Sequence, residues 1–78
     1  MDDTENKIRN ILKIITKNDD PTNWGAEYIF YPGEIDSLDM ATFALNLEEA
    51  FNVKIPDDIL ANMYSIENAE QSIRLIKG

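Results

Sequence analysis

The chain contains neither cysteine nor histidine, and this narrows the chemistry open to its 78 residues. A Ser-His-Asp triad, a Cys-His nucleophile pair and a His-containing zinc site are all excluded. The reactive groups that remain are carboxylates, hydroxyls, lysines and any group added after translation. We therefore expect no catalytic residue, no metal site and no enzymatic activity. Among the hydroxyls Ser37 stands out, because Asp36 precedes it and a helix is predicted to begin there.

A helix over residues 37–51 is predicted to position the Ser37 hydroxyl. Asp36 is a suitable N-cap, and Asp39 places a negative charge in the first turn, where the helix dipole favours it. Asn52 is suited to a left-handed turn at the other end. The face that we expect to enter the core consists of Phe43, Ala44, Leu47 and Phe51.

Three further helices complete the prediction. The first is capped within residues 2–5 and ends before Pro21, since residues that precede proline avoid the helical region. Asp57 is expected to cap a short helix over residues 58–63, and Ser65 a last helix. The apolar faces of the first and last helices consist of Ile8, Ile11, Leu12 and Ile15, and of Ile66, Ala69, Ile73 and Ile76. We therefore predict an all-α fold over the single domain 1–78, a small four-helix bundle with three longer helices and one short one.

A long loop over residues 18–36 is predicted between the first two helices. It contains several turn formers and also five large apolar residues: Trp24, Tyr28, Ile29, Phe30 and Tyr31. A loop this apolar is expected to pack onto the bundle. Residues 28–31 could form a strand, but the sequence offers no partner strand for it.

Three segments at fixed spacing carry a family resemblance. Glu34-Ile35-Asp36-Ser37-Leu38-Asp39-Met40 is followed by Glu48-Glu49-Ala50-Phe51 and then by Ile55-Pro56-Asp57-Asp58. Together they resemble the acyl carrier proteins, in which an Asp-Ser-Leu signature begins a helix that leads to an acidic-acidic-x-Phe segment and to Ile-Pro-Asp. Chain length, helix order and acidity also fit that family.

The resemblance implies a role for Ser37. In the family this serine is joined by a phosphodiester to 4′-phosphopantetheine, a covalent cofactor derived from coenzyme A. A phosphodiester anion is well placed in the first turn of a helix, beside free N–H groups and the positive end of the dipole. A lone Asp-Ser-Leu would more often be a simple N-cap, but the flanking segments favour an attachment site. Ser65 and Ser72 lack such flanks and are interpreted as a cap and a helix-surface residue.

The family also implies a function and partners. The chain would carry acyl intermediates as thioesters and present them to enzymes of fatty-acid, polyketide or related biosynthesis. Its partners would be a phosphopantetheinyl transferase and the acyl-loading, acyl-transferring or condensing enzymes, all with basic docking surfaces. Predicted partner-binding residues around Ser37 are Asp36, Leu38, Asp39, Met40, Leu45, Glu48 and Glu49. Met40 and Leu45 are expected outside the core as apolar anchors, whereas Ala41, Ala44 and Met63 are core candidates.

Charge supports this choice of partner. The net charge is −8, and residues 34–58 hold seven carboxylates against the single base Lys54. Such a field attracts basic protein surfaces and disfavours nucleic acid. No apolar run approaches a membrane span, and the acidic N-terminus does not resemble a signal peptide. We expect a cytoplasmic monomer.

Other functions remain open or are excluded. A peptidyl or D-alanyl carrier would share the fold and the modified serine, and an unmodified acidic interaction domain would share the fold alone. A calcium-binding EF-hand starting at Asp20 is rejected, because Trp24 and Tyr31 would stand at ligand positions.

The chain also departs from the family: Gly33 and Glu34 replace the usual Leu-Gly pair before the serine. We expect Phe30 or Tyr31 to fill the space of that leucine, and interpret the aromatic loop as a sign of a specialised carrier.

Overall fold

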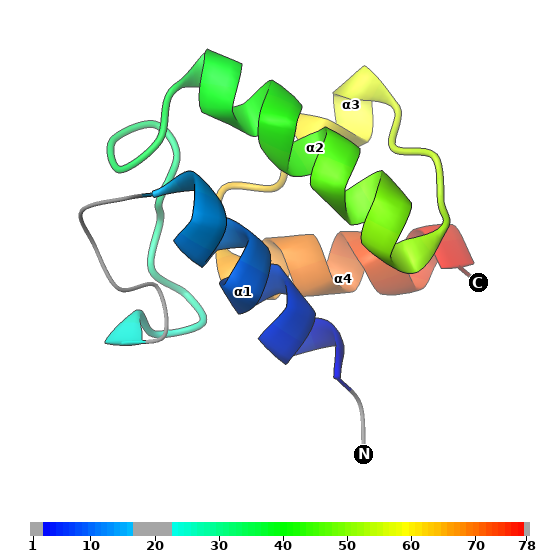
Figure 1. The fold of residues 1–78 in the computed structure, drawn as a ribbon, viewed down its shortest axis with the longest axis horizontal. Helices are drawn as coiled ribbons and strands as arrows, with labels where there is room; N and C mark the ends of the chain where they lie inside the picture. Colours follow the sequence, from blue (N-terminus) through cyan, green and yellow to red (C-terminus); the bar gives the residue numbers. More distant parts are fainter. Residues whose placement is uncertain (1–2, 17–22, 78) are drawn as a thin grey trace.

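The computed structural model describes residues 3–16 and 23–77, and it contains the predicted helical bundle. The helices are α1 (Thr4–Ile15), α2 (Ser37–Phe51), α3 (Asp57–Leu60) and α4 (Ile66–Lys77). α1 packs against both α2 and α4, and the short α3 lies in the connection between α2 and α4 (Figure 1). The prediction of three longer helices and one short one is confirmed. The segment around Pro21 that was expected to end α1 lies outside the described residues.

The core collects the inner face of every long helix. α1 and α4 contribute the apolar residues that their spacing predicts, with Ile15 and Ile76 half-buried at the ends. From α2, the residues Phe43, Ala44, Leu47 and Phe51 are buried, as expected. Four further apolar side chains enter from the connections: Phe30, Ile35, Ile55 and Met63. Burial of each large side chain stabilises the fold by about 1.5–3 kcal/mol, so these four are a substantial part of the core.

The described part of the long connection, residues 23–35, packs onto the bundle as predicted. Phe30 is fully buried and meets Phe43 of α2 edge-on, with ring centroids 5.8 Å apart. Trp24 stacks on the outer side of Phe30, at 5.9 Å. No strand forms among the described residues; Ile29 makes only an isolated antiparallel bridge with Ser65 of the connection that precedes α4.

Hydrogen bonds to backbone groups of this connection attach it to α1, to α4 and to the residues just before α4. The Phe30 N–H donates to the Tyr64 carbonyl at 2.9 Å, and the Glu67 N–H in α4 donates to the Ala26 carbonyl at 2.8 Å. On the other side, Arg9 of α1 donates through Nη1 to the Trp24 carbonyl at 2.7 Å. The connection is thus an ordered layer over one end of the bundle.

The residue before Glu34 explains one departure from the family pattern. Gly33 has a φ of 145°, a conformation that side-chain-bearing residues rarely adopt. A leucine at this position would be strained. Of the apolar residues close to it in the chain, Phe30 is completely buried and Ile35 nearly so. That Phe30 takes the place of the family's leucine stays a prediction.

Four local predictions are wrong. Met40, expected outside the core, is only 4% exposed, whereas the core candidate Ala41 is exposed. Asp57 does not cap α3: it is the first residue of the helix, Pro56 is the N-cap, and no side chain caps it. The helix also ends at Leu60 instead of Met63. The short α3 lies between two buried side chains, Ile55 before it and Met63 after it.

Candidate functional site

The start of α2 presents Ser37 at the first helical position. Asp36 is the N-cap, and its side chain accepts a hydrogen bond from the Asp39 N–H at 2.9 Å. The Asp39 carboxylate accepts in return from the Asp36 N–H at 3.4 Å, which completes a capping box. The two aspartates therefore fix the helix start, and Ser37 is left exposed. The cap is Asp36, so the alternative role of Ser37 as an N-cap is wrong.

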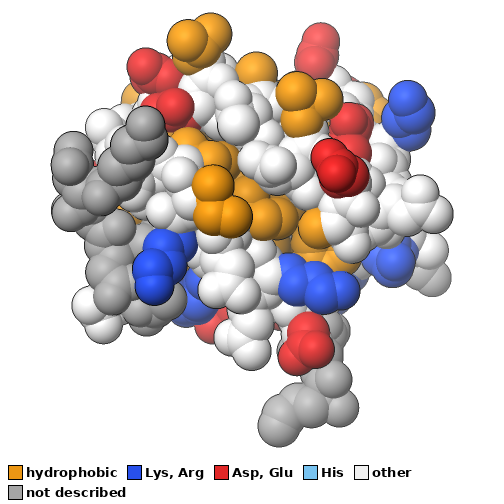
Figure 2. All heavy atoms as spheres, viewed as in Figure 1, with side chains coloured by type: hydrophobic (Ala, Val, Ile, Leu, Met, Phe, Trp, Pro, Cys, Tyr) orange, Lys and Arg blue, Asp and Glu red, His pale blue; other side chains and the backbone are white. Residues whose placement is uncertain are grey.

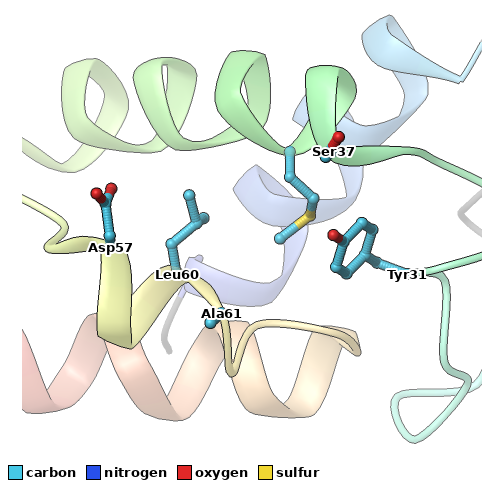
Figure 3. A pocket seen from close by; sticks show the side chains of 6 residues that line it. Tyr31, Ser37, Asp57, Leu60 and Ala61 are labelled. Carbon is cyan, nitrogen blue, oxygen red and sulfur yellow. The ribbon is translucent and has the colours of Figure 1, made fainter.

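A pocket of about 210 Å³ lies beside the Ser37 side chain. Its walls come from three segments: Tyr31 from the long connection, Ser37 and Met40 from α2, and Asp57, Leu60 and Ala61 from α3 and the residue after it. In Figure 3, Leu60 projects from α3 toward α2, with Tyr31 at one end of the pocket and Asp57 at the other.

Sequence reasoning missed three of these pocket residues. Tyr31 had been considered only as a substitute for the missing leucine, and Leu60 and Ala61 had no assigned role. Met40 was predicted to be an exposed anchor, but it is buried and lines the pocket. The sequence signal for the α3 side of the pocket was the Ile55-Pro56-Asp57 segment. This segment predicts that a helix begins there, but it does not predict which other helix the new helix lies against.

The predicted partner-binding residues divide into two groups by their contacts. Leu38 and Leu45 are 78% and 65% exposed, and Glu49 is also exposed. Asp36 and Asp39 are joined in the capping box, although Asp36 is exposed. Glu48 accepts a hydrogen bond from the Ile55 N–H at 2.9 Å and is half-buried.

Charges on the surface are distributed unevenly. In Figure 2, acidic side chains gather mainly over the half of this face where α2 lies, and basic side chains lie mostly over α1. Hydrophobic side chains are exposed between them. Two of the basic residues of α1 have partners: Arg9 pairs with Glu5 at 2.9 Å, and the Lys7 ammonium lies 5.4 Å from the centre of the Phe51 ring. Within the described residues, no three carboxylates cluster in a way that could hold a metal ion.

Comparison with known proteins assigns the family. Residues 6–73 match the family model of the phosphopantetheine attachment site. The chain belongs to the acyl carrier protein family. Over 45 residues it is 40% identical to the acyl carrier protein of Kineococcus radiotolerans, covering 58% of this chain and 56% of the relative. Over 36 residues it is 44% identical to that of Kocuria rhizophila, covering 46% of this chain and 44% of the relative.

The acyl carrier protein of Myxococcus xanthus is 42% identical over 36 residues, with 46% of each chain covered. The chain thus spans about half the length of the curated relatives that it matches. The family model implies 4′-phosphopantetheine as a covalent cofactor, as the sequence predicts. The family model describes an attachment site, and the names of the relatives describe carriers and not enzymes. None of the described helices is long and apolar enough to cross a membrane.

The start of α2 fits this cofactor. Its attachment needs an accessible hydroxyl and an environment that tolerates a phosphodiester anion. Ser37 is exposed, and it lies at the N-terminus of a 15-residue helix, where backbone N–H groups without helical acceptors and the helix dipole favour negative charge. The adjoining pocket opens at the same place.

Proposed function

We propose that Ser37 carries the 4′-phosphopantetheine arm and that this carrier holds acyl intermediates as thioesters. The observation that carries the proposal is an exposed serine at the first position of α2, with its helix start already capped by Asp36. The hydroxyl is therefore free to accept the phosphopantetheinyl group. When bound, the arm supplies a terminal thiol for the thioester. The chain's own residues contribute the attachment hydroxyl, the electrostatic field at the start of α2 and the surface on which partner enzymes dock.

The proposed domain is residues 1–78, acting as a cytoplasmic monomer in fatty-acid, polyketide or related biosynthesis. A transferase must supply the base and the metal, because the chain has no histidine to activate the serine. The proposed docking surface combines the exposed Leu38 and Leu45 with the acidic residues around them, among which Asp36 and Glu49 are exposed. Apolar anchors inside a charged rim are typical of protein interfaces.

Mass spectrometry tests the attachment. Incubation with coenzyme A, magnesium and a broad-specificity transferase should add one phosphopantetheine to the chain. Ser37→Ala should abolish the addition while the helical circular dichroism stays nearly unchanged. Ser72→Ala in α4 is the control and should be modified like the original chain. Modification that persists in Ser37→Ala would refute the assignment, and no modification of the original chain would leave an unmodified interaction domain as the better description.

A further inference from the structure

Glu48 and Glu49 are neighbouring glutamates near the end of α2, yet their surroundings differ. Glu49 is exposed, and in the described part of the chain it has no hydrogen-bond or ion-pair partner. Glu48 is half-buried, and its Oε2 accepts the Ile55 N–H at 2.9 Å. The carboxylate of Glu48 therefore reaches across the turn that ends α2. A hydrogen bond to an ionised acceptor is stronger than one between neutral groups.

Glu48 also organises the rest of that turn. Its carbonyl oxygen accepts the N–H groups of Asn52 and Val53, the latter at 3.1 Å. Asn52 adopts a left-handed conformation, with φ 55° and ψ 52°. Three N–H groups of residues 52–55 are thus satisfied by the backbone and side chain of one residue. The side-chain bond is the last of the three, and it is the one that reaches the residue before Pro56.

The position of Ile55 determines where α3 begins. Ile55 is 8% exposed and enters the core, and Pro56 follows it as the N-cap of α3, with a φ of −63°. The Pro56 carbonyl accepts the N–H groups of Ile59 and Leu60, at 3.1 and 2.9 Å. Because the proline ring restricts φ, little backbone freedom separates Ile55 from the helix. No residue of α3 is itself buried, and its only apolar contacts with the core are those of the half-buried Ile59 and Leu60.

α3 in turn forms one wall of the pocket beside Ser37, through Asp57, Leu60 and the following Ala61 (Figure 3). We infer that Glu48 is a positioning residue, whose bond to the Ile55 N–H holds α3 against this pocket. The inference rests on the proposed function only for the statement that the pocket adjoins the arm. It separates the two glutamates by role: Glu49 is the charge offered to a basic partner, and Glu48 maintains the pocket wall.

Amide hydrogen exchange on the full, unmodified chain tests this role. The informative amides are those of Leu60, Ala61 and Met63, which donate within and just after α3 and do not touch Glu48. Glu48→Ala removes the acceptor, and Glu48→Asp keeps the charge but shortens the reach by one methylene. Both should speed exchange at these amides by about 10-fold or more, the effect expected for losing a charged acceptor. Glu48→Gln keeps an acceptor oxygen without the charge and should stay within about 3-fold of the original chain.

Glu49→Ala is the matched control and should leave the α3 amides unchanged. If Glu48→Ala fails to fold, the difference in α3 amide exchange between Glu48→Asp and Glu48→Gln is enough to decide whether the Glu48 side chain holds α3. Unchanged α3 amides in Glu48→Asp, or equal acceleration in Glu49→Ala, would overturn the inference. The measurement needs no arm on Ser37. Its failure is therefore distinct from failure of the mass test, which alone decides the attachment.

Discussion

Two connections shape the pocket beside Ser37, and they are held in different ways. Residues 23–35 are anchored by the fully buried Phe30, by Trp24 stacked upon it, and by backbone bonds to Tyr64 and Glu67. Residues 52–65 are anchored by the buried Ile55 and Met63 at the two ends of α3, by the half-buried Ile59 and Leu60 that pack against the core, and by the Glu48 side chain. The first connection, which we call the firm connection, has a completely buried aromatic ring at its centre. The second, which we call the lighter connection, has buried side chains only at the two ends of α3, and no residue of α3 itself is buried.

The largest expected effect tests the firm connection. Phe30→Ala removes a fully buried ring that contacts Phe43 and Trp24, and it should lower the free energy of unfolding by about 3–5 kcal/mol. Urea denaturation followed by circular dichroism measures the loss. Tyr28→Ala, at a half-exposed ring of the same connection, is the control and should cost far less. Equal losses would show that Phe30 is not the main anchor.

The second effect tests the lighter connection. Ile55→Ala deletes a side chain at the edge of the core, and it should lower the free energy of unfolding toward the lower end of about 2–5 kcal/mol. Exchange at the Leu60 and Ala61 amides should increase more than exchange in α1. Ile59→Ala, at a half-buried position of α3, should have a smaller effect on stability. A loss for Ile55→Ala larger than that for Phe30→Ala would reverse the proposed ranking of the two connections.

A pair of arginines tests the link between α1 and the firm connection. Arg9 and Arg74 each pair with a glutamate four residues earlier, both at 2.9 Å, but only Arg9 also donates to the Trp24 carbonyl. Arg9→Ala should therefore lower the free energy of unfolding by about 1.5 kcal/mol or more. Arg74→Ala removes an exposed salt bridge within α4 and should lower the free energy of unfolding by about 0.5 kcal/mol at most. Thermal melts at fixed salt check the difference, and similar costs would mean that the Trp24 bond adds little.

The smallest effect on stability concerns Glu49. This exposed carboxylate lies in the last turn of α2, where the helix dipole disfavours anions, so Glu49→Lys should stabilise the fold by about 0.3–1 kcal/mol. The same change should slow modification of Ser37 by a transferase with a basic docking surface. Glu67→Lys, in the first turn of α4, is the control for net charge. If both variants slow the reaction equally, total charge and not the α2 surface governs docking.

Salt provides a further test on the original chain. The melting temperature should rise as sodium chloride goes from low to physiological concentration, because the acidic surface repels itself and exposed charges are screened over about 8–10 Å. Magnesium at equal ionic strength should raise it further. A flat or falling melting temperature would indicate that the carboxylates are already well paired, as Glu48 is with the Ile55 N–H.

The sequence by itself determined the three long helices and the attachment candidate. Asp36, Asn52 and Ser65 act through neighbours in the chain, so their roles at helix ends could be predicted and are confirmed: Asp36 caps α2, Asn52 is left-handed, and the Asn68 N–H donates to the Ser65 hydroxyl at 3.2 Å. The apolar faces of α1, α2 and α4 follow from helical spacing for the same reason.

Only the tertiary structure decided what the connections do. The burial of Met40, Ile35 and Phe30 depends on which segments lie over them, and helical spacing carries no such information. Likewise, the pocket beside Ser37 exists because Tyr31 and residues of 57–61, which are distant in the sequence, both lie beside the start of α2. Glu48 and Glu49 read as equivalent acids in the sequence. Their difference arises because the chain turns back after α2 and brings the Ile55 N–H to one carboxylate and not to the other.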